Sequence, residues 1–267
     1  MTQYDTKIKA NHAEIEAACM KSYEDLTEKD LRIQLAASYR LIEQLGWSFL
    51  IFGHLTARVP GPNKHFLINP YGLHYSEVTA SNLVKVDLEG NVIGSALYPV
   101  NRAGIVIHTA IHAARPDVHC IAHTHTTAGM AVACSQGGLR ADNFYSALLN
   151  NHVAYHGFEG ITVMEDEKKR LVSNLGDKSL MILENHGLLS TGRSVAEAFV
   201  NLWGMERACQ VQTLADSTGQ PGIQISDAIL AKSEHLAAIQ SMGEPAGQLE
   251  FEAFTRLIEK IDPSYKT

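Results

Sequence analysis

The sequence predicts one α/β domain, because segments with helical periodicity alternate with short apolar segments typical of strands. The chain has 267 residues, which fits one large α/β domain. Hydrophobic residues make up 45% of the chain and charged residues 19%, so a sizeable core can form. No repeat or low-complexity segment divides it. We therefore expect residues 1–267 to form one domain, with an N-terminal arm over 1–24 and C-terminal helices over 218–267.

The clearest local signals are those that begin and end helices. Thr27 and Asp30 form a capping-box pattern that predicts the start of a helix. Apolar residues at helical spacing follow, and Gly46 predicts the end of that helix. Ser194 and Glu197 form a second capping-box pattern before another long helical segment. The predicted helices cover about 28–45, 102–114, 126–135, 195–214, 226–242 and 246–261.

Short apolar segments bounded by turn residues predict the strands. Residues 83–88 alternate apolar and polar side chains before Glu89-Gly90-Asn91, which indicates a hairpin. Two other short segments, 118–122 and 180–183, are largely apolar, as expected for buried strands. The predicted strands cover 56–59, 66–68, 83–88, 118–122 and 180–183.

Composition and charge exclude several classes of function. The net charge of −7 argues against nucleic-acid binding, which requires a basic face. The N-terminal residues lack the apolar core of a signal peptide, and no apolar segment is long enough to span a bilayer. The four cysteines are scattered, without a disulfide or CxxC pattern. We therefore predict a cytoplasmic protein with no nucleic-acid or membrane partner.

Three histidines follow the two apolar strands and suggest a metal site. His123 and His125 come directly after the predicted strand 118–122, and residues two apart on a strand face the same side. His186 follows the predicted strand 180–183. If these strands lie close together in the sheet, the three imidazoles can bind one ion and leave a position open, as catalytic zinc sites do. On spacing alone, half-buried histidines with purely structural hydrogen bonds are an equally good interpretation.

His108 and His112 are four residues apart and share one face of the predicted helix 102–114. The glutamate of the zinc-binding HExxH pattern is missing, because Thr109 stands beside His108. We therefore favour histidines that pack the helix through hydrogen bonds.

Several segments, taken in order, show that the chain resembles the class II aldolase/adducin family over roughly residues 27–215. They are residues 52–58, 68–72, 83–87, 113–118, 123–125 and 185–187. The resemblance implies a three-layer α/β/α domain with a largely antiparallel central sheet. It also implies that His123, His125 and His186 bind a divalent metal, with Zn²⁺ preferred and Fe²⁺ or Mn²⁺ as alternatives. The aldolases of the family imply a homotetramer.

The chain departs from the family's aldolases at the substrate site. Their catalytic glutamate corresponds to Gly104, and their phosphate-binding serine pair corresponds to Arg102 and Ala103. An early phosphate-contacting asparagine corresponds to His54. These departures resemble the adducin-like branch, which lacks the glutamate. They leave His108 as the candidate acid/base, with Glu184 as an alternative.

Two functions follow from the resemblance. The preferred one is a metal-dependent lyase or non-heme iron oxygenase that acts on a small carbonyl or hydroxy-acid, and not on a sugar phosphate. The alternative is a non-catalytic adducin-like interaction module with a vestigial metal site. The missing long basic tail of the adducins leads us to prefer the enzyme.

Overall fold

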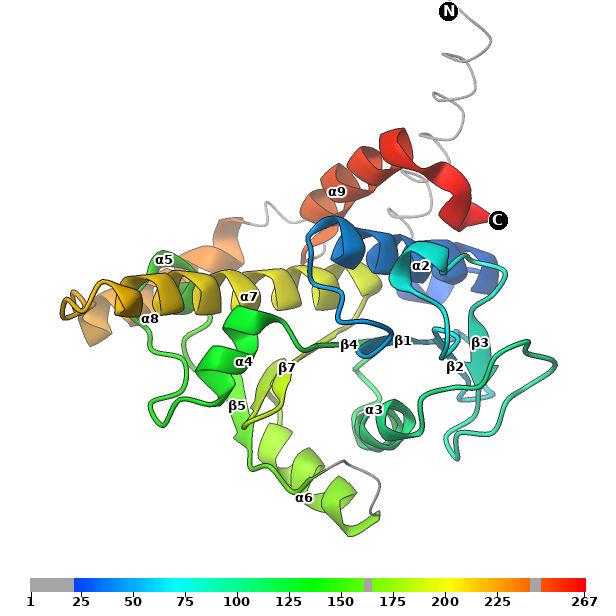
Figure 1. Ribbon diagram of the computed structural model, residues 1–267, viewed down its shortest axis with the longest axis horizontal. Coiled ribbons are helices and arrows are strands. Elements are labelled where there is room, and N and C mark those ends of the chain that lie inside the picture. Colours follow the sequence, from blue (N-terminus) through cyan, green and yellow to red (C-terminus); the bar gives the residue numbers. More distant parts are fainter. Residues whose placement is uncertain (1–21, 161–164, 241–245) are drawn as a thin grey trace, which may run out of the picture.

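A three-layer α/β/α arrangement is seen in the computed structural model, which describes residues 22–160, 165–240 and 246–267. Helices α2 and α7 cover one face of the central sheet, and α3 and α6 cover the other (Figure 1). Helix α9 packs outside α2 and α7. The bounds of the α-helices are α2 Glu28–Gln44, α3 Arg102–Ala114, α4 Thr127–Ala133, α5 Phe144–Leu148, α6 Glu165–Leu175, α7 Val195–Ser217, α8 Asp227–Gln240 and α9 Gln248–Ile261.

The central sheet of the described chain has seven strands in the order β3-β2-β1-β4-β7-β6-β5. Neighbouring strands are antiparallel except β5 and β6, which are parallel. The predicted fold class and the largely antiparallel sheet are therefore confirmed. The strand bounds are β1 His54–Arg58, β2 Phe66–Ile68, β3 Val84–Val86, β4 Cys120–Thr124, β5 Val153–His156, β6 Leu180–Leu183 and β7 Gly187–Gly192.

The helix that covers β1 begins and ends where its local sequence predicts. Thr27 Oγ1 accepts a hydrogen bond from the Asp30 backbone N–H, and the Asp30 carboxylate accepts one from the Thr27 N–H. This capping box satisfies two amide groups that the first helical turn leaves unpaired. After α2, Gly46 adopts a positive φ of 69° and directs the chain toward the sheet.

Strand β4 lies two residues later than the predicted strand 118–122. The Val118 amide donates to the Arg115 carbonyl and closes a turn, which keeps Val118 out of the strand. At the other end, pairing with β7 continues through Thr124, opposite Leu188. His123 therefore lies inside the strand and only His125 follows it.

Strand β7 was missed by the sequence analysis, together with β5 and α6. All six residues of β7 are buried, so the strand lacks the alternation that marks a half-exposed strand. The predicted hairpin after residues 83–88 is reduced to a tight turn, with a single bridge between Val86 and Val92. In this turn the Asp87 carboxylate accepts hydrogen bonds from the backbone amides of Glu89 and Asn91.

Residues 1–21 of the predicted arm and residues 241–245 of the C-terminal region lie outside the described residues. Within the described part, no helix combines the length and apolar character needed to cross a membrane.

Candidate metal centre

The three histidines that the sequence places near the ends of two strands lie together in the structure. They lie where β4 ends and where the chain turns from β6 into β7. The ring centroids of His123 and His125 are 4.7 Å apart, and His186 lies 4.8 Å from each of them. Their candidate ligating nitrogens all lie within 4.8 Å of one another. His123 is buried, while His125 and His186 are partly exposed, so the group opens toward solvent on one side.

The strand register holds His123 in an orientation suited to binding a metal. It pairs with Leu189 of β7, and its Nδ1 lies 2.8 Å from the Leu188 carbonyl oxygen. A carbonyl oxygen only accepts, so Nδ1 carries the proton and Nε2 of the neutral ring has the lone pair. Metal-binding histidines commonly donate their second ring nitrogen to a backbone carbonyl in this way.

The adjoining His125 ring supplies a direct test of whether a cation fits. Its Nε2 lies 2.8 Å from Nε2 of His123. Because Nε2 of His123 has a lone pair, Nε2 of His125 either carries a proton or also points its lone pair at a shared cation. The second arrangement is that of a metal site. Three imidazole nitrogens within 4.8 Å of one another form a donor set that fits a divalent ion.

A tight turn between β6 and β7 places His186 beside the other two rings. Asn185 has a positive φ of 56°, and the His186 amide donates to the Leu183 carbonyl. A side chain at Gly187 would overlap the Thr124 carbonyl oxygen, so a glycine is required where the turn meets β4. The third histidine thus depends on β7, a strand that pairs directly with β4.

Burial keeps the candidate ligands in the unprotonated form that a metal requires. It lowers the pKa of His186 to about 4, with a smaller contribution from His125. Burial also lowers the pKa of His123 well below its ordinary value, and the neighbouring His186 and His125 lower it further. Each ring can therefore offer a lone pair at neutral pH.

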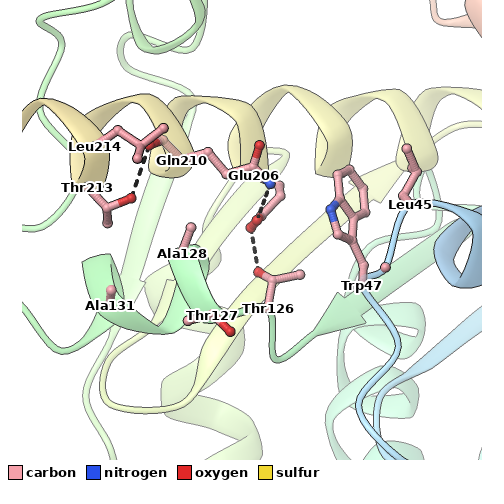
Figure 2. A pocket seen from close by; sticks show the side chains of 11 residues that line it. Leu45, Trp47, Thr126, Thr127, Ala128, Ala131, Glu206, Gln210, Thr213 and Leu214 are labelled. Carbon is pink, nitrogen blue, oxygen red and sulfur yellow. Dashed lines mark hydrogen bonds between the residues drawn. The ribbon is translucent and has the colours of Figure 1, made fainter.

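A buried glutamate on α7 fixes the segment that follows His125. The Glu206 carboxylate accepts hydrogen bonds from the Thr126 hydroxyl and the Gln210 amide (Figure 2). Burial raises the pKa of Glu206. These residues line a pocket of about 430 Å³ beside Trp47.

A second group of histidines lies on the α3 side of β1. His54 is directly opposite His123 in the β1–β4 register, with ring centroids 5.1 Å apart. Its Nδ1 lies 3.0 Å from Nε2 of His108. Thr56 Oγ1 contacts both His108 and His112, at 2.7 and 2.8 Å. The two helix histidines therefore pack through hydrogen bonds, as the sequence analysis favoured.

No role for His54 follows from the sequence pattern, although His54 and Gly104 are both positions at which the resemblance to the family's aldolases breaks down. The structure connects the two positions. A Cβ at Gly104 would lie 2.5 Å from Nε2 of His54 and 2.7 Å from its Cγ. The His54 ring thus occupies the space over Gly104, and a glutamate there requires His54 to move. Arg102 lies exposed at the start of α3, and Glu184 lies exposed two residues before His186.

We expect the metal-free protein to lose stability as the pH falls from about 6.5 toward 4. Burial lowers the pKa of His54 to about 3 and that of His108 well below its ordinary value. Above pH ~6.5 these groups are neutral in both states. Below pH ~6.5, these histidines bind protons in the unfolded chain but not in the folded one. Each histidine therefore lowers the free energy of unfolding by up to about 1.4 kcal/mol per pH unit. Urea denaturation at several pH values measures this, and stability that is flat over this range would contradict it.

Comparison with known proteins identifies the family. Residues 33–213 match the model of the class II aldolase and adducin N-terminal domain. Rat alpha-adducin is 45% identical over 260 residues, which cover 91% of this chain and 34% of that protein. The chain belongs to the class II aldolase/adducin family.

Two solved structures are similar over nearly the whole chain. An aldolase II superfamily protein from Pseudomonas syringae has 43% identity and a TM-score of 0.85, covering 90% of this chain and 96% of that chain. An L-fuculose 1-phosphate aldolase from Glaciozyma antarctica PI12 has 33% identity and a TM-score of 0.79, covering 90% and 93%. Class II aldolases generally depend on a divalent metal, and the histidine group found here could hold one.

Proposed function

We propose that this protein is a metal-dependent enzyme, of the lyase type, that acts on a small hydroxy- or keto-acid. The observation that carries the proposal is the convergence of His123, His125 and His186 within 4.8 Å. Zn²⁺ is the proposed ion, and Fe²⁺ and Mn²⁺ are the alternatives; imidazole suits both zinc and iron. When bound, such an ion polarises the oxygen atoms of a substrate.

The charge of the site favours an anionic substrate. Three neutral imidazoles leave the full +2 charge of a divalent ion uncompensated. The carboxylate of a hydroxy- or keto-acid would compensate part of it, and the second oxygen of the acid would complete a chelate. The partly exposed rings of His125 and His186 leave a side from which such a small molecule can enter.

A non-catalytic interaction module is the second candidate, and the similarity to rat alpha-adducin favours it. The absence of a carboxylate at Gly104 agrees with this alternative. Stoichiometric metal binding alone does not separate the two candidates. Turnover or specific binding of a small acid does.

A sugar-phosphate aldolase is the third possibility to test, because the L-fuculose 1-phosphate aldolase from Glaciozyma antarctica PI12 is 33% identical to this chain. We infer that this chemistry is absent here, since Gly104 provides no group to move a proton. His54 also fills the space from which a glutamate side chain would extend.

Purification without oxygen, followed by elemental analysis, tests the proposed function first. We expect about one divalent ion per chain. The loaded protein is then screened for turnover of small hydroxy- and keto-acids, where product formation supports an enzyme. Metal-loaded protein that neither binds nor converts any of these acids would favour the interaction module.

The proposed homotetramer gives a separate prediction. We expect light scattering at micromolar concentration to give four times the chain mass of 29.2 kDa. The expectation rests on the aldolases of the family. A mass equal to one chain would contradict it.

A further inference from the structure

Four buried side chains form a hydrogen-bonded row that ends beside the candidate metal centre. The row consists of His112, Thr56, His108 and His54, with contacts of 2.8, 2.7 and 3.0 Å between successive members. At its far end, Nδ1 of His112 lies 3.3 Å from the Val118 carbonyl oxygen. Each of the four side chains is at most 4% exposed.

The three histidines of this row are neutral at neutral pH. An ordinary imidazole is already mostly neutral above pH ~6.5, and burial lowers the pKa of His108 and His112 well below that value. Each ring therefore has one N–H group and one lone pair.

The carbonyl of Val118 fixes the position of every proton in the row. It can only accept, so His112 carries its proton on Nδ1 and offers a lone pair at Nε2. The hydroxyl of Thr56 donates to that lone pair and must then accept from Nδ1 of His108. Nε2 of His108 consequently accepts from Nδ1 of His54, and the lone pair of His54 is on Nε2.

The position of this lone pair connects the row to the metal centre. His54 is the cross-strand partner of His123, and its Nε2 lies over Gly104, 2.5 Å from where a Cβ would be. In the described part of the chain no side chain or backbone group donates a hydrogen bond to it. The row thus ends in an acceptor on a ring whose centroid lies 5.1 Å from that of His123, a candidate metal ligand.

We propose that the row fixes the tautomer of His54, so that Nε2 accepts a hydrogen bond from a ligand hydroxyl at the metal centre. The site then prefers hydroxy-acids to keto-acids, because a keto oxygen has no proton to donate. The selectivity rests on the proposed function, whereas the tautomer does not. His54 acts as a specificity-determining residue, and Thr56, His108 and His112 as positioning residues.

Nitrogen NMR of ¹⁵N-histidine-labelled, Zn²⁺-loaded protein tests the tautomer directly. We expect Nδ1 of His54 to be protonated and Nε2 to be unprotonated in the wild-type protein. Thr56→Val keeps the side-chain size but breaks the row, so His54 should populate the opposite tautomer. Thr56→Ser restores the hydroxyl and should restore the wild-type spectrum. A proton on Nε2 in the wild-type protein would overturn the proposal, whatever the variants do.

Calorimetry with two anions of similar size, lactate and pyruvate, tests the selectivity. We expect the wild-type protein to bind lactate more tightly, with a contribution of about fivefold from the hydrogen bond to His54. In Thr56→Val this contribution should vanish, so the ratio of the two dissociation constants should fall about fivefold. Thr56→Ser should recover it. The metal content of each protein, measured in parallel, should stay constant.

The possible results distinguish a failure of the proposed selectivity from a failure of the proposed substrate class. Binding of both acids with the same ratio in the wild-type protein and Thr56→Val would overturn the selectivity and leave the substrate class standing. Binding of neither acid by metal-loaded protein would contradict the substrate class and the selectivity together. X-ray absorption showing four histidine nitrogens on the metal, instead of three, would assign the lone pair of His54 to the ion and overturn its role toward the ligand.

Discussion

Replacing His123 with alanine is expected to lower the metal affinity by more than about 100-fold, since the loss of a group that only orients a ligand already costs 10–100-fold. His123 is the most constrained of the three candidate ligands. Its backbone pairs with β1 and β7, and its Nδ1 bonds to the Leu188 carbonyl. His125→Ala and His186→Ala should each weaken binding as well, because three protein ligands are the usual set of a catalytic site.

A competition titration with a coloured chelator measures these affinities. His65→Ala removes a histidine that lies outside the group and is the matched control, with the affinity of the wild-type protein expected. Circular dichroism verifies that each variant is folded. Wild-type affinity in any two of the three ligand variants would show that the metal binds elsewhere.

The second large effect expected is the absence of sugar-phosphate cleavage at an enzymatic rate. General acid–base catalysis contributes roughly 10²–10⁴-fold, and Gly104 has no group to supply it. Metal-loaded protein is incubated with fuculose, rhamnulose and ribulose phosphates. A coupled dehydrogenase then follows release of dihydroxyacetone phosphate or glycolaldehyde. Turnover of about one per second would show that Gly104 is not disabling, since typical enzymes reach 1–10³ per second.

Restoring the glutamate alone should damage the protein rather than activate it. In Gly104→Glu the new Cβ meets the His54 ring, and we expect a loss of about 1–3 kcal/mol in unfolding free energy. The double variant Gly104→Glu with His54→Asn removes the ring and should recover most of that loss. Urea denaturation measures both. Equal stability of Gly104→Glu and the wild-type protein would mean that the two positions are not coupled.

The elements marked by local chemistry were predictable from the sequence. Helix α2 begins at the Thr27 cap, and α3 spans the predicted residues 102–114. Strand β7 was not predictable in the same way, because its sequence GLLSTG has only two apolar side chains and begins and ends with glycine. It therefore shows neither the period-two pattern of a strand facing solvent nor the continuous apolar run from which β6 was predicted.

The candidate site shows the same division between local and non-local information. The spacing of His123 and His125 predicts their shared face, and the structure places His186 beside them. The expected reason was incomplete, because β6 is not adjacent to β4. Strand β7 lies between them and returns from the His186 turn to pair with β4.

The row that ends at His54 depends on contacts that local pattern does not specify. It needs the register of β1 against β4 and the packing of α3 on β1. His54 and His108 are separated by 54 residues. The available signal was the pair of departures at His54 and Gly104 that the family resemblance implied. In the structure the ring of His54 fills the space over Gly104.

X-ray absorption on protein purified without oxygen or added chelator tests the central claim most directly. We expect one divalent ion per chain, coordinated by three histidine nitrogens at about 2.0–2.1 Å if the ion is Zn²⁺, with oxygen in the remaining positions. The His123→Ala protein should lose that spectrum. An ion without histidine nitrogen around it, or an unchanged spectrum in the variant, would contradict the assignment of His123, His125 and His186 as its ligands.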